Sequence, residues 1–234
     1  MKVTFKQFLE DITIDDDAYH KDDSDTVIKG GATVRDNGAR LIKAKWKDVP
    51  LQKPFPFSGY TVKYNAQKTP QWSGGKSYDI ALFDDETGKI VVNIECSAHD
   101  YQVPGGTIKG LSTEQLSSAK EYRGKGLVVA LYKCLAENGQ NLFSATLQTS
   151  GGASVWKRLV GVVDAEVYVV LPSHAAESKH FTVPRGVDLD HYDYVLVKGS
   201  EERLNRAAYD VDGDAFWFVT PGISPQMKKY VVTT

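Results

Sequence analysis

The chain has 234 residues, of which 41% are hydrophobic and 25% are charged, enough for a substantial buried core. Its 28 basic and 30 acidic side chains give a formal charge of −2, so no overall positive field attracts nucleic acid. No apolar run approaches the roughly 20 residues that span a bilayer, and the start of the chain lacks the apolar stretch of a signal peptide. We therefore expect a single cytoplasmic domain that does not enter a membrane.

Residues 1–70 are interpreted as an N-terminal extension. Apolar residues at helical spacing predict a short amphipathic helix over residues 4–12. The six aspartates between residues 15 and 25 predict a solvated loop, because the glycine and terminal glutamate of a calcium-binding EF-hand loop are absent. A strand is expected from Gly59 to Tyr64.

The next segment is typical of a β-hairpin. Apolar and polar residues alternate over 78–83, and β-branched residues dominate 89–97, with the turn sequence Asp84-Asp85-Glu86-Thr87-Gly88 between them. These two strands are expected to pair antiparallel. The following residues, 99–110, contain Pro104-Gly105-Gly106 and predict a flexible loop that borders a substrate site.

A strand, a glycine turn, a helix and a second strand follow. Residues 111–119 and 141–149 are compatible with strands, and apolar residues at positions i, i+3, i+4 and i+7 predict a helix that begins near Leu127 and ends at Asn138-Gly139. Between the first strand and the helix lies Glu121-Tyr122-Arg123-Gly124-Lys125-Gly126. Two glycines at the start of a helix present backbone N–H groups and the positive end of the helix dipole, which predicts an anion-binding turn. The alternative is a tight turn that only starts the helix, with Arg123 and Lys125 solvated.

The run Arg123-Gly124-Lys125-Gly126-Leu127-Val128 resembles the signature of the GNAT acyltransferase superfamily, in which Arg or Gln is followed by x, x, Gly, x, and Gly or Ala. Val128 departs from it, since a small residue is usual there. A second segment, 150–161, is similar to the family's next helix motif, Asn-x-x-Ala-x-x-x-Tyr-x-x-x-Gly, with Trp156 near the tyrosine. The resemblance covers roughly residues 78–198.

The resemblance implies an α+β fold with a mixed, mostly antiparallel sheet flanked by helices. Its core would be 78–198, with extensions at 1–70 and 199–234. The implied activity is transfer of an acyl group, most simply acetyl from acetyl-coenzyme A, to an amine of a small molecule or a protein. The turn amides would hold the cofactor pyrophosphate, and a backbone N–H on the strand would polarise the thioester carbonyl. The implied cofactor-binding residues are Leu116, Ser117, Ser118, Arg123, Gly124, Lys125, Gly126, Leu127 and Val128.

Acyl transfer to an amine also needs a general base that deprotonates the amine. The candidates are Glu114, Glu95 and His99, because each lies on or beside a strand expected to flank the site. The alternative for each is an exposed strand carboxylate or a loop histidine. Trp156 stands where the family has a proton-donating tyrosine, so Ser150 and Ser154 are candidate replacements; Ser150 is alternatively a helix cap. A thiolate with a reference pKa of about 8.5 also leaves without an acid.

The remaining residues predict structure more than chemistry. Cys96 and Cys134 are expected to be core thiols, and the irregularly spaced His174, His180 and His191 indicate surface or substrate-loop histidines instead of a metal site. Strands are expected at 165–171, 192–198, 215–219 and 230–232, and a helix at 201–209. The aromatic strand at 215–219 is interpreted as a sheet extension, with a partner surface as the alternative.

Two other functions remain open. A GNAT-fold binding protein without catalysis is favoured by Val128 and Trp156, and the opening residues faintly resemble leader helices of phage internal head proteins, which would make the chain a phage effector in a host cytoplasm or a virion. Modification of nucleic-acid bases is disfavoured by the acidic charge unless a local basic groove exists, formed by Lys43, Lys45, Lys47, Lys53, Lys63 and Lys68.

Overall fold

The computed structural model describes residues 45–66, 77–145, 150–176, 181–185, 187–199 and 215–233. The predicted helices at 4–12 and 201–209, the aspartate-rich segment, Lys43, Lys68 and His180 lie outside these residues. No helix in the described ranges is long and apolar enough to cross a membrane.

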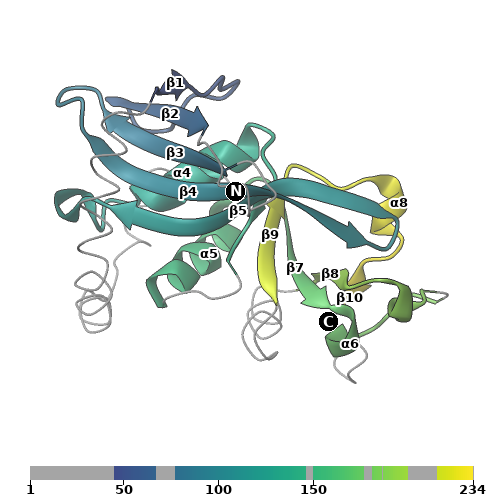
Figure 1. Cartoon of the computed structure of the whole chain (residues 1–234). Coiled ribbons are helices and arrows are strands. Elements are labelled where there is room, and N and C mark those ends of the chain that lie inside the picture. Colours follow the sequence, from purple (N-terminus) through teal and green to yellow (C-terminus); the bar gives the residue numbers. More distant parts are fainter. Residues whose placement is uncertain are drawn as a thin grey trace.

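The described part of the chain is α+β and is built on one open sheet with the strand order β1-β2-β3-β4-β5-β6-β9-β7-β8-β10 (Figure 1). Most neighbouring strands are antiparallel; the β5–β6 and β8–β10 pairs are parallel. The strands are β1 Lys47–Asp48, β2 Tyr60–Ala66, β3 Ser77–Asp84, β4 Ile90–Val103, β5 Gly106–Ser118, β6 Leu142–Phe143, β7 Glu166–Pro172, β8 Tyr194–Lys198, β9 Phe216–Thr220 and β10 Val232–Thr233. The helical elements are η1 Lys120–Tyr122, α4 Leu127–Glu137, α5 Ser150–Val162, α6 Ser173–Ala176, η2 Leu189–His191 and α8 Pro225–Lys228.

The predicted β3–β4 hairpin is confirmed, but the predicted loop over 99–110 is wrong. Strand β4 continues to Val103 and β5 begins at Gly106, so this segment forms the far half of a long hairpin (Figure 1). The reason is burial. Val103 and Ile108 pack in a cluster of aromatic side chains, and this burial stabilises continued pairing of β4 with β5. The hairpin tip approaches α8 so closely that a Cβ on Gly105 (φ +86°) would lie 2.8 Å from the Tyr230 ring.

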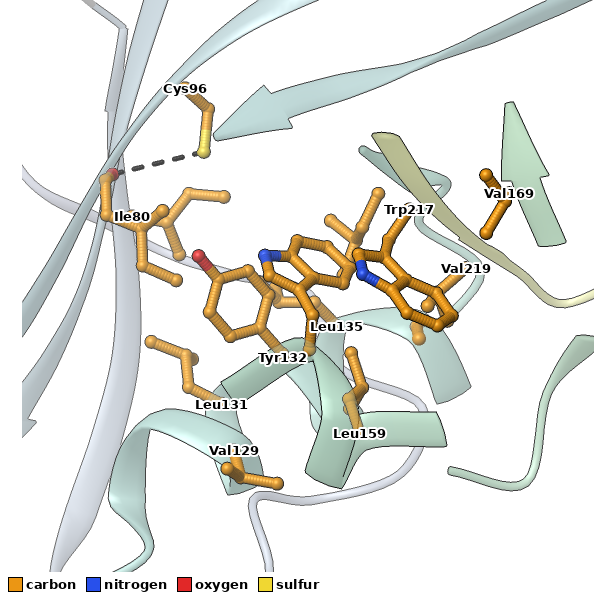
Figure 2. Close-up of a cluster of buried hydrophobic side chains, with 14 of the residues drawn as sticks. Ile80, Cys96, Val129, Leu131, Tyr132, Leu135, Leu159, Val169, Trp217 and Val219 are labelled. Atoms are coloured by element: carbon orange, nitrogen blue, oxygen red, sulfur yellow. Dashed lines mark hydrogen bonds between the residues drawn. The ribbon is translucent and has the colours of Figure 1, made fainter. Parts of the chain in front are cut away.

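Helix α4 and its neighbour α5 cover one face of the sheet (Figure 2). The predicted helix at 127–138 is confirmed, as are the buried thiols of Cys96 and Cys134. Val129 is the fully buried valine of the first turn, whereas Val128 is only half-buried. Tyr132 of α4 and Trp156 of α5 pack together with ring centroids 5.1 Å apart.

A second core cluster consists of aromatic residues, chiefly Phe143, Tyr168, Phe216 and Phe218. Its centre is β9, the aromatic strand predicted at 215–219, and all five of its residues are buried. In the strand order β9 lies between β6 and β7, inside the sheet instead of at its edge. Figure 1 shows β9 beside β7. Strand β2 before residue 78 and β9 after residue 198 thus belong to the same sheet as the expected core.

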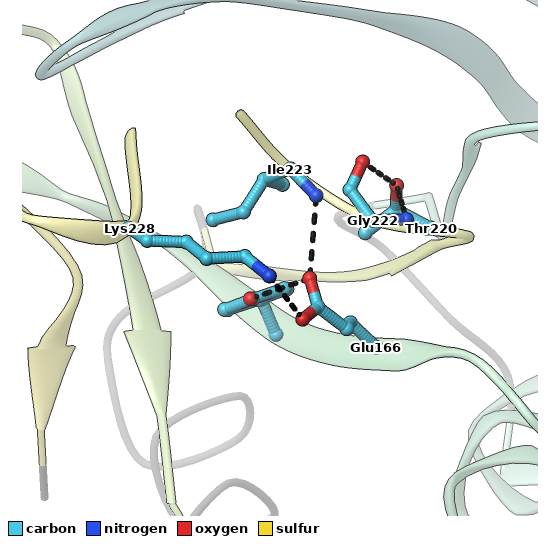
Figure 3. Close-up of polar contacts among 6 residues, drawn as sticks. Glu166, Thr220, Gly222, Ile223 and Lys228 are labelled. Carbon is cyan, nitrogen blue, oxygen red and sulfur yellow. Dashed lines mark hydrogen bonds and ion pairs between the residues drawn. The ribbon is translucent and has the colours of Figure 1, made fainter. Parts of the chain in front are cut away.

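Glu166 fastens the C-terminal segment to the sheet (Figure 3). Its Oε1 accepts a hydrogen bond from Lys228 Nζ at 2.8 Å, and its Oε2 accepts from the Ile223 backbone N–H at 3.2 Å and the Tyr168 hydroxyl at 3.0 Å. Burial alone would raise the pKa of this carboxyl, but the hydrogen bonds from Lys228, Ile223 and Tyr168 hold the pKa below its ordinary value.

Candidate functional site

The parallel strands β5 and β6 meet over only two residues and then separate. The paired residues are Leu111 with Leu142 and Ser112 with Phe143. The next β5 residue, Thr113, still donates its hydroxyl to the Phe143 carbonyl at 3.2 Å. Beyond it, Ser144 leaves β5 and donates its backbone N–H to Trp217 of β9 at 2.9 Å. Within the described chain, the β5 edge from residue 113 to residue 118 therefore has no partner strand on the β6 side.

Gly110 explains why the two strands come together before they separate. A Cβ at this position would lie 2.7 Å from the Asn141 carbonyl oxygen and 2.7 Å from the Phe143 ring. Glycine thus permits an approach that any side chain would prevent. The predicted strand at 141–149 is correspondingly short, because only Leu142 and Phe143 pair before the chain turns to β9; residues 146–149 lie outside the described ranges.

Leu116, Ser117 and Ser118, which the sequence predicts to bind a cofactor, lie on this edge. On their other side they pair with Ile94, Asn93 and Val92 of β4. Backbone N–H groups in an antiparallel pair alternate in direction, so at least one of three consecutive residues directs its N–H away from β4. Such an amide can donate to a ligand that lies along β5.

The glycine turn follows β5 directly, between η1 and α4. Gly124 (φ +74°) and Gly126 (φ +72°) both adopt the left-handed conformation, and Gly126 is the N-cap of α4 with no side chain that caps the helix. In the part of the chain that the structure describes, no acceptor bonds the backbone N–H groups of residues 124–128. The first turn of a helix leaves these donors without intrahelical partners. Leu127 is buried below them, and Val128 is half-buried beside them.

Charge at the turn favours an anion. Lys120, Arg123 and Lys125 are exposed there, and Glu121 is the single acidic residue from 120 to 126. Arg123 Nε donates to the Ser118 carbonyl at 3.3 Å, and Lys125 Nζ lies 4.7 Å from the centre of the Tyr122 ring. These contacts keep both cations beside the free amides.

Tyr122 attaches the start of the turn to the β3–β4 hairpin, a support that the sequence did not reveal. Its hydroxyl donates to Asp84 Oδ2 at 2.8 Å. Asp84 Oδ1 accepts from the backbone N–H groups of Thr87 at 2.8 Å and Glu86 at 3.0 Å. The Thr87 N–H first, and then the Tyr122 hydroxyl, lower the pKa of Asp84, so it carries its charge at neutral pH. The turn is therefore held by a structured hairpin.

Two of the three base candidates, Glu114 and His99, are brought together by a β-bulge. The β4–β5 register shifts between Glu95 and Cys96, which leaves Glu114 without a ladder partner and its side chain exposed. His99 Nε2 lies 3.7 Å from Glu114 Oε1. Glu95, the third candidate, is half-buried on the ladder opposite Gln115 and Asp79.

Ser97 and Tyr101 belong to this cluster and were missed from the sequence. The Ser97 hydroxyl donates to Glu114 Oε1 and lies 2.9 Å from His99 Nε2. The Tyr101 ring stacks on His99 with centroids 5.8 Å apart and an interplanar angle of 17°. Burial, followed by the nearby Tyr194 and Glu114, raises the pKa of Tyr101 to about 12. The two-residue spacing of 97, 99 and 101 on one strand is the signal that places these side chains on a common face.

The candidate acids on α5 are placed differently. Trp156 is 3% exposed and packs on Tyr132 in the core, so its ring supplies no proton to a thiolate. Ser150 is the first residue of α5, and Ser154 is exposed one turn later. The described hydrogen bonds of the Glu114 cluster come from β4 and β5 alone.

The histidines show no metal arrangement in the described residues. His174 is exposed on α6, and His191 pairs with Asp188 at 2.9 Å. No group of metal-ligating side chains occurs in the described ranges. Neither a protein-family model nor a curated protein matches the sequence.

Proposed function

We propose that this protein transfers an acyl group from an acyl-coenzyme A, most simply acetyl-coenzyme A, to an amine. The observation that carries the proposal is the combination of a β5 edge that has no partner strand among the described residues with a glycine turn at its end. A single ligand could bind at both places if it had an anionic group for the turn and an extended, amide-containing arm for the β5 edge. Coenzyme A has this form, with a pyrophosphate and a pantetheine arm.

The order of the elements supports the same proposal. An antiparallel hairpin, a strand, the Arg-Gly-Lys-Gly turn, α4, a second parallel strand and α5 follow one another as the GNAT resemblance implies. In this arrangement the pyrophosphate accepts from the N–H groups of residues 124–128, and the thioester lies beside residues 116–118. An amide there stabilises negative charge on the carbonyl oxygen.

Glu114 is the base in this scheme. It lies on β5 two residues before Leu116, and its exposed carboxylate is oriented by the Ser97 hydroxyl. General-base catalysis of this kind contributes about 10²-fold or more to a rate. His99 takes a supporting position, and no acid is needed on α5, because a coenzyme A thiolate is a tolerable leaving group near neutral pH.

A binding protein that has kept this fold without catalysis is the second candidate. Val128 at the second position of α4 and the buried Trp156 favour it, because the first narrows the pyrophosphate site and the second removes the family's proton donor. The nucleic-acid alternative has less support, since Lys63 is paired with Asp48 at 3.8 Å and also lies 5.1 Å from the centre of the Phe83 ring.

Calorimetric titration with acetyl-coenzyme A tests the proposal, and pantetheine, which lacks the pyrophosphate, is the comparison ligand. We expect Gly124→Val to weaken acetyl-coenzyme A binding at least tenfold, since a β-branched residue disfavours φ +74° and removes the turn that presents the amides. Pantetheine binding should change little.

Gly139→Val is the matched control for this variant. Gly139 also has a positive φ, +93°, and open space around it, but it lies at the far end of α4. Both variants carry similar backbone strain, and only Gly124→Val should lose affinity. Equal acetyl-coenzyme A affinity in the two folded variants and the wild type would show that the turn does not bind the cofactor.

A further inference from the structure

Three side chains of the β4–β5 hairpin form one hydrogen-bonded line. Ser97 lies in the middle, bonded to Glu114 Oε1 on one side and 2.9 Å from His99 Nε2 on the other. His99 and Glu114 are themselves 3.7 Å apart at their nearest atoms, beyond hydrogen-bond distance. The serine hydroxyl is therefore the group that connects the carboxylate to the imidazole.

Because Ser97 has a single hydroxyl proton, that proton determines which atom donates and which accepts in the two hydrogen bonds. Ser97 donates this proton to the Glu114 carboxylate, so its oxygen accepts from His99 Nε2–H. When the neutral imidazole instead carries its proton on Nδ1, Nε2 is an acceptor, so a protonated Glu114 donates to Ser97 Oγ and Ser97 donates to Nε2. One proton then passes from Glu114 through Ser97 to Nε2 with no movement of heavier atoms, which makes His99 an imidazolium. Loss of the Nδ1 proton to water leaves the neutral imidazole with its proton on Nε2.

The surroundings hold His99 in position and leave it open to water. Its side chain is 45% exposed, and its ring stacks on Tyr101. Tyr101 is fixed in turn by Phe143 and Phe216, each with a ring centroid 4.8 Å away. On the same hairpin, Lys109 Nζ and Asp100 Oδ2 are paired with each other at 2.6 Å. The imidazole is consequently a suitable exit for a proton to solvent.

We propose that Ser97 relays to His99 the proton that Glu114 removes from the acceptor amine, and that His99 delivers it to water. The inference rests on the proposed function. The amine nitrogen bonds the thioester carbonyl carbon, the carbon–sulfur bond breaks, and coenzyme A leaves as a thiolate. The proton lost by the nitrogen moves to Glu114 and then through Ser97 to His99 Nε2, which restores the carboxylate. The imidazolium releases its Nδ1 proton to water, and exchange with water returns the remaining proton from Nε2 to Nδ1 before the next turnover.

The test measures thiol release from acetyl-coenzyme A, with n-butylamine as the acceptor probe and with water alone, together with acetyl-coenzyme A affinity by calorimetry. Ser97→Ala should lower the rate constant of thiol release about tenfold, with unchanged affinity. Ser97→Thr keeps the hydroxyl on a residue suited to a strand and should restore the rate. Thr107→Ala is the control, because it removes a hydroxyl bonded to Gln102 at 3.0 Å on the same hairpin.

A wild-type rate in Ser97→Ala would overturn the relay and leave the proposed function standing, as would a Ser97→Thr rate as low as that of Ser97→Ala. A wild-type protein that does not bind acetyl-coenzyme A would refute the proposed function and the relay together. A wild-type protein that binds it but releases no thiol in either condition would refute both Glu114 as base and its relay, while the cofactor site would remain.

Discussion

Val128 is the residue at which this sequence departs from the glycine signature, which has a small residue at that position. It occupies the second position of α4, half-buried, beside amides that have no acceptor in the described chain. Its two methyl groups occupy space that an anion on the helix N-terminus would otherwise approach. Under the proposed function, the Val128 side chain limits how closely the cofactor pyrophosphate approaches the turn.

We predict that Val128→Ala tightens acetyl-coenzyme A binding, because the smaller side chain removes the steric limit while alanine favours the helix. Lost core contact should cost about 1 kcal/mol of unfolding free energy. Calorimetry and urea unfolding measure the two effects. Val129→Ala, in the same turn but fully buried, is the control and should lose stability without a change in affinity. Weaker binding by a stable Val128→Ala variant would contradict the steric explanation.

At the scale of elements, the site depends on how β5 is paired along its length. Near Gly110 it is held between β4 and the chain entering β6, and beyond Thr113 its only partner among the described strands is β4. The bulge opposite Cys96 lies within this second half and sets the orientation of Glu114. The close approach of β5 to the chain entering β6 at Gly110 is thus followed, a few residues later, by a stretch of β5 that has no described partner on that side.

Gly110→Ala should therefore destabilise the protein by about 1–3 kcal/mol, because the added methyl group forces Asn141 and Phe143 away from β5. Urea unfolding measures the loss. Gly161→Ala is the matched control: Gly161 lies in α5 with open space around it, so alanine should raise stability by about 0.5–1 kcal/mol. Equal stability of Gly110→Ala and the wild type would mean that the strands are not in close contact at this point.

At the scale of the whole molecule, the C-terminal residues complete the sheet. Strand β9 fills the space between β6 and β7, and the segment after it returns to β7 through Glu166 (Figure 3). This network joins residues that are about sixty positions apart. It links the stability of the sheet to the charge of one carboxylate.

The lowered pKa of Glu166 predicts a pH dependence of stability. A carboxyl whose folded pKa lies below its unfolded value of about 4.3 contributes stability above that pH and loses it as the pH falls through the folded pKa. Glu166→Gln should cost about 1 kcal/mol at pH 7, since Lys228 loses its partner. The difference from the wild type should shrink below about pH 5. Urea unfolding of the wild type and the variant, at pH 7 and at a second pH below the folded pKa, measures the difference in unfolding free energy. Glu86→Gln is the control, because Glu86 is an exposed carboxyl in the β3–β4 turn. An equal difference at both pH values would exclude the carboxylate charge as the cause.

The sequence by itself determined those elements that depend on interactions between neighbouring residues. The β3–β4 turn and the limits of α4 follow from turn residues and from apolar spacing, which act over a few neighbouring residues. The helix α5 was expected only from the resemblance of residues 150–161 to a family motif. The glycine turn between β5 and α4 was identified for the same reason, because glycines directly before an apolar helix mark a sharp turn. The prediction of a loop over 99–110 was wrong because Pro104-Gly105-Gly106 looked like a long break, whereas only a tight turn was needed.

The tertiary structure alone decided which distant residues meet. Ser97 and Glu114 are 17 positions apart and become neighbours through the β4–β5 register and its bulge, which no local pattern specifies. Among the described residues, the second half of β5 has no partner on the β6 side because the chain after β6 bonds to β9, a strand more than seventy residues later. Trp156 enters the core because α5 packs on α4, so the residue that aligned with a proton donor faces Tyr132 instead. Pairing between strands far apart in sequence is determined by the burial of whole faces, and that information is spread over the entire chain.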